Sequence, residues 1–355
     1  MARKNSSGTL IFDGRTHATL AGEVSEAAKI LIQGGLVAFP TETVYGLGAA
    51  ALDPHAVKQI FHAKGRPMDN PLIIHIAKAS QMQTLAQNIP SAAWTLAAHF
   101  WPGPLTLVLR KQAHVPAATT GGLDSVAIRV PAHPAALALL QAAAIPVAAP
   151  SANLSGRPSP TTAAHVLHDL AGRIDAVLDG GPCDVGVEST VLDIRDGKPI
   201  VLRPGAVTPA QIRAVLQRDC SVATWLQDSG DKPPSPGLKY LHYAPQAPLY
   251  LLKGAPERQL STLEQLQQQF QAQGKRVGLI LSAESATHQK AAELVVLGHR
   301  NQPAVLAAHL YDALRYFDER EIDVIIAEGY STEGMGLALM NRLEKAAGPR
   351  VIDVG

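Results

Sequence analysis

The sequence is poor in cysteine and in net charge, and both shortages exclude classes of protein. Only two of its 355 residues are cysteines, Cys183 and Cys220, too few for a disulfide framework, and neither stands in a pair spaced to bind zinc. Lysine and arginine number 31 against 30 acidic residues, so the net charge is +1. No general basic field therefore indicates a nucleic-acid partner.

Long apolar runs and common nucleotide motifs are missing as well. No stretch approaches the roughly 18 apolar residues of a membrane span, and no apolar run follows the charged N-terminus. We therefore expect no membrane contact, no secretory signal and a cytoplasmic location. The chain has no Gly-x-x-x-x-Gly-Lys-Ser/Thr phosphate loop, no His-Glu-x-x-His and no Cys-x-x-Cys, and Gly46-Leu-Gly48 lacks the third glycine of a dinucleotide fingerprint.

What is present predicts two α/β domains. Hydrophobic residues make up 46% of the chain, enough for a sizeable core, and three prolines and two glycines within 228–237 exclude a helix or central strand there. We expect a first domain over 1–227, a linker over 228–246 and a second domain over 247–355. Short apolar runs that alternate with helical patterns favour mostly parallel sheets covered by helices.

The pattern also predicts the individual elements. Strands are expected at 36–39, 72–76, 105–109, 126–130, 146–149, 190–194, 249–252, 277–281, 294–297 and 323–327. Helices are expected at 56–63, 92–100, 134–143, 161–170, 262–273 and 304–317. For the helix at 262–273, Ser261 and Glu264 form a capping-box pattern and Gly274 follows its end.

Polar segments follow several of these strands, where open α/β sheets bind ligands. The first is Phe39-Pro-Thr-Glu-Thr-Val-Tyr-Gly-Leu-Gly48, whose hydroxyls could hold a polar molecule or form an ordinary turn. The second is Lys64-Gly-Arg66, at the end of an expected helix. Both cations could reach one anion there, or Lys64 could complement the helix dipole. We expect Lys64 and Arg66 to serve phosphates rather than the fold, because exposed cations contribute little to stability.

Three further features complete the candidate set. His75 interrupts an apolar strand, where a histidine is more often a hydrogen-bonded core residue. The segment 149–161, rich in serine, could present hydroxyls and N–H groups to phosphate before a helix, or be a surface loop. Glu188-Ser-Thr-Val191 precedes a strand and Arg203-Pro-Gly205 follows the next, which makes Arg203 a candidate third phosphate cation.

In this order, the motifs resemble the YrdC-type family of threonylcarbamoyl-AMP synthases. The similarity covers residues 20–215, and the segments 235–245 and 328–347 resemble its long, two-domain form. The resemblance implies a twisted open mixed sheet, with parallel and antiparallel pairs, followed by a smaller Rossmann-like α/β domain. It also implies a nucleotidyltransferase that converts ATP, bicarbonate and L-threonine into threonylcarbamoyl-AMP and pyrophosphate. That product would supply the machinery that makes threonylcarbamoyladenosine in tRNA.

The resemblance further implies the site residues. Lys64 and Arg66 would be catalytic, and ATP would be bound by Lys64, Arg66, Asn70, Ser125, Ser151, Asn153, Ser159, Arg203 and Tyr243. Threonine would be bound by Thr43, His75, Arg129, Ala149 and Ser189, with the Arg129 guanidinium on its carboxylate. No dedicated metal site is evident, so magnesium is expected to arrive with ATP. The linker is expected to form a lid that carries Tyr243 to the nucleotide; tyrosines packed against the second domain are the alternative.

Two other functions remain open at this point. One is a noncatalytic module that binds double-stranded RNA or tRNA, which the near-zero net charge and the 5% aromatic content disfavour. The other is a related carbamoyl-transferring enzyme with another acceptor or carbamoyl donor. Omission of single substrates would separate these three functions.

Overall fold

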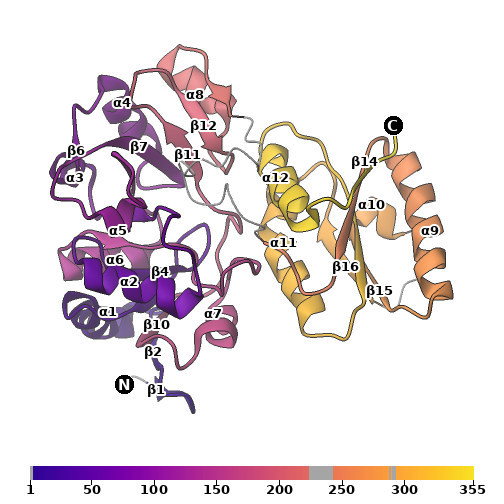
Figure 1. The fold of residues 1–355 in the computed structure, drawn as a ribbon, viewed down its shortest axis with the longest axis horizontal. Helices are drawn as coiled ribbons and strands as arrows, with labels where there is room; N and C mark the ends of the chain where they lie inside the picture. Colours follow the sequence, from indigo (N-terminus) through magenta and orange to yellow (C-terminus); the bar gives the residue numbers. More distant parts are fainter. Residues whose placement is uncertain (1–2, 224–242, 288, 290–292) are drawn as a thin grey trace. The chain divides into compact units, whose positions relative to one another are not determined.

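The computed structural model describes residues 3–223, 243–287, 289 and 293–355 (Figure 1). It divides into two compact units. Unit 1 comprises Met1–Ser155 and Ser159–Tyr240, and unit 2 comprises Gly156–Pro158 and Leu241–Gly355. Most of the predicted linker, up to residue 242, lies outside the described residues. Within the described ranges, no helix is both long enough and apolar enough to cross a lipid bilayer.

Unit 1 is built on one large mixed sheet. Its strands run in the spatial order β1-β2-β10-β3-β4-β9-β5-β8-β7-β11-β12-β13, and β6 pairs with β7. They are β1 Arg3–Lys4, β2 Leu10–Asp13, β3 Val37–Phe39, β4 Gly46–Ala50, β5 Ile73–His75, β6 Ala86–Gln87, β7 Leu105–Lys111, β8 Ser125–Arg129, β9 Val147–Ala148, β10 Ala176–Asp179, β11 Thr190–Asp193, β12 Ile200–Arg203 and β13 Ser221–Val222. The sheet contains both parallel pairs such as β5/β8 and antiparallel pairs such as β7/β8, so the mixed sheet is confirmed and the mostly parallel sheet is wrong for this unit.

Helices cover this sheet, and their ends position the loops. They are α1 His17–Ile32, α2 Pro54–Lys64, α3 Met82–Leu85, α4 Ser91–Phe100, α5 Ala117–Thr120, α6 Pro134–Ala143, α7 Ala163–Leu170 and α8 Pro209–Leu216, with a 3-10 turn at Ala79–Gln81. In α2 the Asp53 side chain caps the first turn and Pro54 occupies its first position. Gly65 ends the helix at φ +62°, a left-handed conformation that turns the chain toward Arg66.

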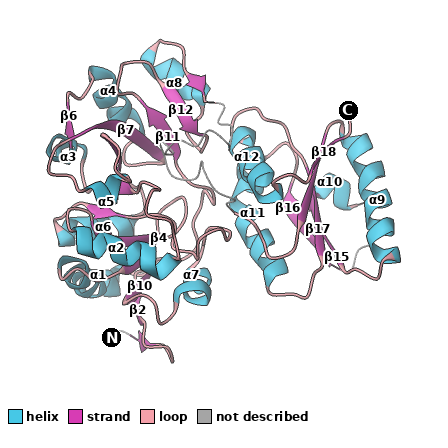
Figure 2. Ribbon diagram, in the orientation of Figure 1, coloured by secondary structure: helices cyan, strands magenta, loops and turns pink. Residues whose placement is uncertain are grey.

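Unit 2 is a smaller α/β layer structure with a wholly parallel sheet. Its order is β16-β15-β17-β14-β18, from β14 Leu249–Lys253, β15 Val277–Ser282, β16 Glu293–Gly298, β17 Val324–Glu328 and β18 Val351–Asp353. The helices are α9 Pro256–Ala272, α10 Ala283–Ala286, α11 Pro303–Asp318 and α12 Gly336–Ala347. Figure 2 shows α9 on one face and α11 and α12 on the other. The predicted smaller α/β domain is confirmed, although its strand order is not that of dinucleotide-binding folds.

Two segments differ from what the sequence led us to expect, for identifiable reasons. The capping box at Ser261 and Glu264 does not form, because α9 already begins at Pro256 and the Ser261 hydroxyl donates to the Arg258 carbonyl inside the helix. Gly46-Leu-Gly48, for which no strand was expected, belongs to strand β4. A Cβ at Gly48 would lie 2.9 Å from atoms of Phe39 and Val147, so glycine permits this close packing between strands.

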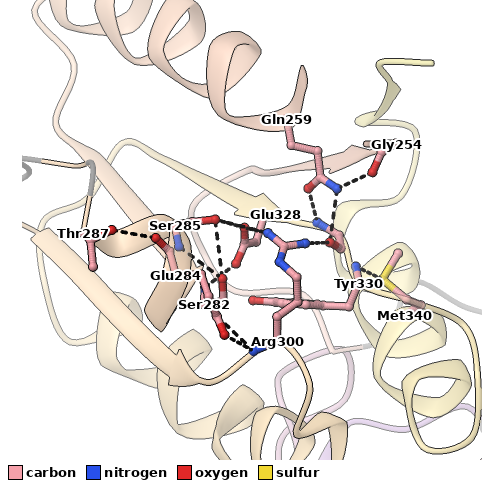
Figure 3. Close-up of polar contacts among 11 residues, drawn as sticks. Gly254, Gln259, Ser282, Glu284, Ser285, Thr287, Arg300, Glu328, Tyr330 and Met340 are labelled. Atoms are coloured by element: carbon pink, nitrogen blue, oxygen red, sulfur yellow. Dashed lines mark hydrogen bonds and ion pairs between the residues drawn. The ribbon is translucent and has the colours of Figure 1, made fainter. Parts of the chain in front are cut away.

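Polar side chains gather at the carboxyl ends of β15 and β17 in unit 2 (Figure 3). The fully buried Glu328 carboxylate accepts hydrogen bonds from the Ser282 amide and, at 2.6 Å, from the Ser285 hydroxyl. It also forms an ion pair of 2.5 Å with Arg300, whose side chain is 23% exposed. Since buried carboxylates are costly unless paired, Glu328 and Arg300 depend on each other.

Replacement of Glu328 by glutamine should therefore destabilise unit 2. The substitution leaves Arg300 without its counter-charge, and we expect a loss of about 2–4 kcal/mol in the free energy of opening. Hydrogen exchange of the β15 and β17 amides measures it. The control is Glu321→Gln, which breaks an exposed pair with Arg276 and should change exchange little. Equal effects of the two substitutions would contradict this interpretation.

Candidate active site

The candidate site begins with a buried arginine at the end of β8. Strands β5 and β8 are parallel and place His75 and Arg129 side by side at their carboxyl ends. The Arg129 guanidinium donates from Nε to the Gly103 carbonyl at 3.1 Å and from Nη1 to the Thr43 hydroxyl at 2.9 Å. Its Nη2 lies 2.7 Å from Oε1 of Glu42. The carboxylate that Arg129 meets in this structure is thus Glu42 of the chain itself.

In the loop after β3, the partners of Thr41 and Thr43 determine which of the two hydroxyls donates to the other. The Thr41 hydroxyl lies 2.6 Å from the Val44 carbonyl, which can only accept, so its one hydrogen is used there. The 2.7 Å contact between the two threonine hydroxyls must then be donated by Thr43. Because Arg129 donates to the same Thr43 oxygen, Thr43 can offer a ligand only an acceptor in this arrangement.

His75 supplies an uncharged imidazole to this cluster. Burial, and secondly the positive charge of Arg129, lower its pKa to about 3. Its ring meets the ring of Phe39 edge-on at 5.9 Å, and its Nδ1 has no hydrogen-bond partner among the described residues. The predicted hydrogen-bonded core histidine is therefore only half right: His75 is buried, but one ring nitrogen is left for another group.

Ser189 and Arg203 lie together, although the resemblance assigned them to different substrates. Arg203 donates to the Ser189 carbonyl from Nε at 3.1 Å and from Nη2 at 3.0 Å. The Ser189 hydroxyl lies 2.8 Å from that of Thr106 on β7. Gly205 allows this approach, because a Cβ there would lie 2.3 Å from the Thr190 amide nitrogen. The Glu-Ser-Thr and Arg-Pro-Gly motifs thus form one contact.

Lys64 differs from the prediction. We expected an exposed cation, but Lys64 is 2% exposed and its Nζ lies 2.5 Å from the carbonyls of both Ser151 and Asn153. It therefore holds the segment that follows β9, and the expectation that it contributes little to the fold is wrong. Arg66 is half-buried and donates to the Pro71 carbonyl at 3.4 Å. The structure brings Lys64, Ser151 and Asn153 together through the backbone of the last two.

The remaining candidates lie at different places in the fold. Ala149 donates its amide to the Ile73 carbonyl, beside the strand that carries His75. The Ser159 hydroxyl donates to Glu188 at 2.5 Å. Ser125 begins β8, four residues before Arg129, or about 13 Å at the rise of a strand. Asn70 lies three residues before β5. Asn70 is fully buried, yet neither amide atom has a hydrogen-bond partner among the described residues.

Tyr243 is buried within unit 2. Its ring centre lies 5.6 Å from that of Tyr311 and 5.4 Å from the guanidinium carbon of Arg342. This is the packing that we named as the alternative to a lid. The contribution of Tyr243 to ATP binding stays a prediction, and the lid segment up to residue 242 lies outside the described residues.

Four residues that contact the candidate site residues were not predicted individually: Thr41, Glu42, Thr106 and Glu188. Thr41, Glu42 and Glu188 stand inside the quoted motifs, so their position was a signal. Thr41 contacts its neighbour Thr43, whereas Glu42 and Glu188 contact residues that are distant in the sequence. Thr106 lies in the apolar run of β7 and gave no signal. Within the described residues, no group of three or more His, Cys, Asp or Glu side chains could hold a metal ion.

Known proteins match both units. A family model for Sua5, YciO and YrdC proteins, described as telomere recombination, matches residues 29–205. A model of the threonylcarbamoyl-AMP synthase C-terminal domain matches residues 207–348. The chain is also 53% identical to a threonylcarbamoyl-AMP synthase of Bacillus subtilis over 93% of this chain and 94% of that protein. The chain belongs to the Sua5/YciO/YrdC family.

Other members of the Sua5/YciO/YrdC family match this chain over almost its full length. A threonylcarbamoyl-AMP synthase of Pyrococcus abyssi is 49% identical over 92% of this chain and 95% of its own. The crystal structure of P. abyssi Sua5 complexed with L-threonine superposes with a TM-score of 0.92, at 47% identity, over 98% of this chain and all of that one. The resemblance to the two-domain form is confirmed. These comparisons do not identify individual site residues, whose roles stay predictions.

The buried Lys64 makes a prediction about stability. Lys64→Met keeps an unbranched side chain of similar length but removes the ammonium that donates to two carbonyls. We therefore expect a loss of about 2–4 kcal/mol in the free energy of unfolding. Arg66→Met is the control and should lose less than about 1 kcal/mol. Urea titrations measure both. A Lys64→Met protein as stable as wild type would show that the two carbonyls do not need the ammonium.

The neutral His75 makes a prediction about pH. In the unfolded chain its imidazole titrates near the ordinary value of 6.5, while the folded pKa is about 3. The unfolded state therefore binds the extra proton, and stability is present above pH 6.5 and lost as the pH falls toward 3. His75→Asn should remove this share, so that its loss of stability between about pH 7 and about pH 5 is smaller than that of wild type by about 2 kcal/mol.

Urea titrations at the two pH values measure the difference. The control is His168→Asn, which removes an exposed imidazole instead of a buried one. We expect the His168 variant to follow wild type. Parallel losses in all three proteins would mean that His75 titrates alike in the folded and unfolded states, and that burial does not lower its pKa.

Proposed function

We propose that this chain is a threonylcarbamoyl-AMP synthase, which uses ATP, bicarbonate and L-threonine and releases pyrophosphate. The observation that carries the proposal is near full-length similarity to synthases of this name, together with a P. abyssi relative solved with L-threonine. The Arg129 cluster supports it, because a buried guanidinium with hydroxyls beside it suits the carboxylate and hydroxyl of threonine.

The proposed chemistry needs two substrates held in line. The threonine amine and bicarbonate form a carbamate, whose oxygen attacks the α-phosphorus of ATP while pyrophosphate leaves. Charge then gathers on phosphate oxygens, so fixed cations and positioning supply most of the catalysis. Arg66, half-buried after α2, and Arg203, behind Ser189, are the cations that we assign to this role, with Lys64 holding the loop of Ser151 and Asn153.

Candidate residues lie at both ends of β5 and β8, and this spacing suits a substrate as long as ATP joined to threonine. His75 and Arg129 stand at the carboxyl ends, and Asn70 and Ser125 at the other. The unpartnered Asn70 amide supports a ligand there, since a buried amide normally finds a partner. Magnesium would arrive with ATP, held mainly by its phosphates. The product would pass to the tRNA threonylcarbamoyl-transfer machinery of the cytoplasm; direct binding of tRNA or double-stranded RNA is the less supported alternative.

Pyrophosphate release should require both L-threonine and bicarbonate. With purified full-length protein, ATP and magnesium, omission of either substrate is expected to reduce the rate to background, because the carbamate that attacks ATP cannot form. Mass spectrometry of the adenylate identifies the product. Equal release without threonine or without bicarbonate would overturn the proposed function, and release that needs another carbamoyl donor would favour a related carbamoyl-transferring enzyme.

A further inference from the structure

We propose that Glu42 makes the threonine subsite selective for a zwitterionic amino acid, by cancelling the charge of Arg129. The inference rests on the proposed function and adds a specificity-determining residue to it. It starts from a buried ion pair that the fold alone does not explain, since well-packed apolar residues are often as stabilising as such a pair.

Glu42 and Arg129 come from separate parts of unit 1. Glu42 stands in the loop after β3, and Arg129 ends β8. Their side chains are 2.7 Å apart at Oε1 and Nη2, and the residues are 8% and 3% exposed. The other carboxylate oxygen, Oε2, accepts the Ala132 amide at 3.0 Å. Glu42 is thus anchored on both oxygens, next to Thr43, which touches the same guanidinium.

The buried titratable groups that lie beside this pair are uncharged. Burial and the charge of Arg129 lower the pKa of His75, and burial also lowers the pKa of His133, so both imidazoles are neutral at physiological pH. Burial raises the pKa of the Cys183 thiol, which keeps it protonated. Asp184 also lies near but is exposed, where water and salt screen it. Of the groups named here, only Arg129 and Glu42 are both buried and charged; the buried Arg203 and Glu188 bond Ser189 and Ser159 instead.

A neutral pair and a lone arginine would select different ligands. A lone buried guanidinium attracts any small anion, and the proposed reaction supplies one in bicarbonate. The same lone charge repels the ammonium that a zwitterion carries beside its carboxylate. With Glu42 next to Arg129, the pocket offers a positive and a negative end, which matches an amino acid and gives no net attraction to a simple anion.

The test compares two ligands on full-length protein by calorimetry without ATP. One is L-threonine, and the other is 3-hydroxybutanoate, which keeps the carboxylate and hydroxyl but lacks the amine. Glu42→Gln retains an oxygen for the Ala132 amide and removes the charge. We expect this variant to bind threonine roughly tenfold more weakly and 3-hydroxybutanoate more tightly than wild type does.

Glu328→Gln is the matched control, because it breaks a buried Glu–Arg pair of the same kind in unit 2. It should lower stability without changing the ratio of the two affinities. An unchanged ratio in Glu42→Gln, or the same change in Glu328→Gln, would overturn the inference.

The wild-type protein and Glu42→Asp keep the inference testable if Glu42→Gln does not fold. Wild type should bind L-threonine at least about tenfold more tightly than 3-hydroxybutanoate, and the aspartate variant should retain this preference because it retains the charge. Equal binding of the two ligands by wild type would overturn the inference. Since these measurements need no turnover, they remain readable even if threonine-dependent pyrophosphate release fails and the proposed function with it.

Discussion

The ion pair between Glu42 and Arg129 joins two loops that the site requires to be close. It ties the polar turn after β3 to the carboxyl end of β8, strands that are separated in the sheet by β4, β9 and β5. Because both groups are buried, removal of either partner leaves an uncompensated charge. The same pair also orders its neighbours, since Thr43 and the Gly103 carbonyl take their hydrogen bonds from the guanidinium that Glu42 holds.

A second buried pair serves unit 2 in a similar way. Glu328 ends β17 and receives donors from Ser282, Ser285 and Arg300, which joins the ends of adjacent strands. In both units a buried carboxylate pairs with an arginine from another segment, and one member of each pair ends a strand. The surroundings differ in kind: a neutral imidazole, His75, lies beside the unit 1 pair, whereas the hydroxyl and backbone donors of Ser285 and Ser282 lie at the unit 2 pair (Figure 3).

Many of the strands and helices, and the family, were predicted correctly from the sequence. The apolar runs located β5, β7, β8 and β11 to within a residue or two at most ends, and α6 begins and ends where its pattern predicts. Motif order indicated the family, because several spaced blocks rarely coincide. Two failures have a common cause. The burial of Lys64 depends on carbonyls of Ser151 and Asn153, and the partner of Arg129 is set by strand order, neither of which local patterning encodes. The start of α9 was missed because Pro256 is a favourable first helical residue that the capping pattern at Ser261 obscured.

The contacts between motifs depend on glycine at two positions far apart in the sheet. At Gly205 a Cβ would lie 2.3 Å from the Thr190 amide nitrogen, so only glycine lets Arg203 reach the Ser189 backbone. At Gly121 the left-handed φ of +59° and a distance of 2.7 Å from a Cβ to the Asp69 carbonyl impose the same requirement next to Asn70. Two backbone approaches thus bound the site at opposite ends of β5 and β8, and side chains of ordinary size could not be accommodated at either. The site is therefore set first by where backbones meet, and the charged side chains act within that frame.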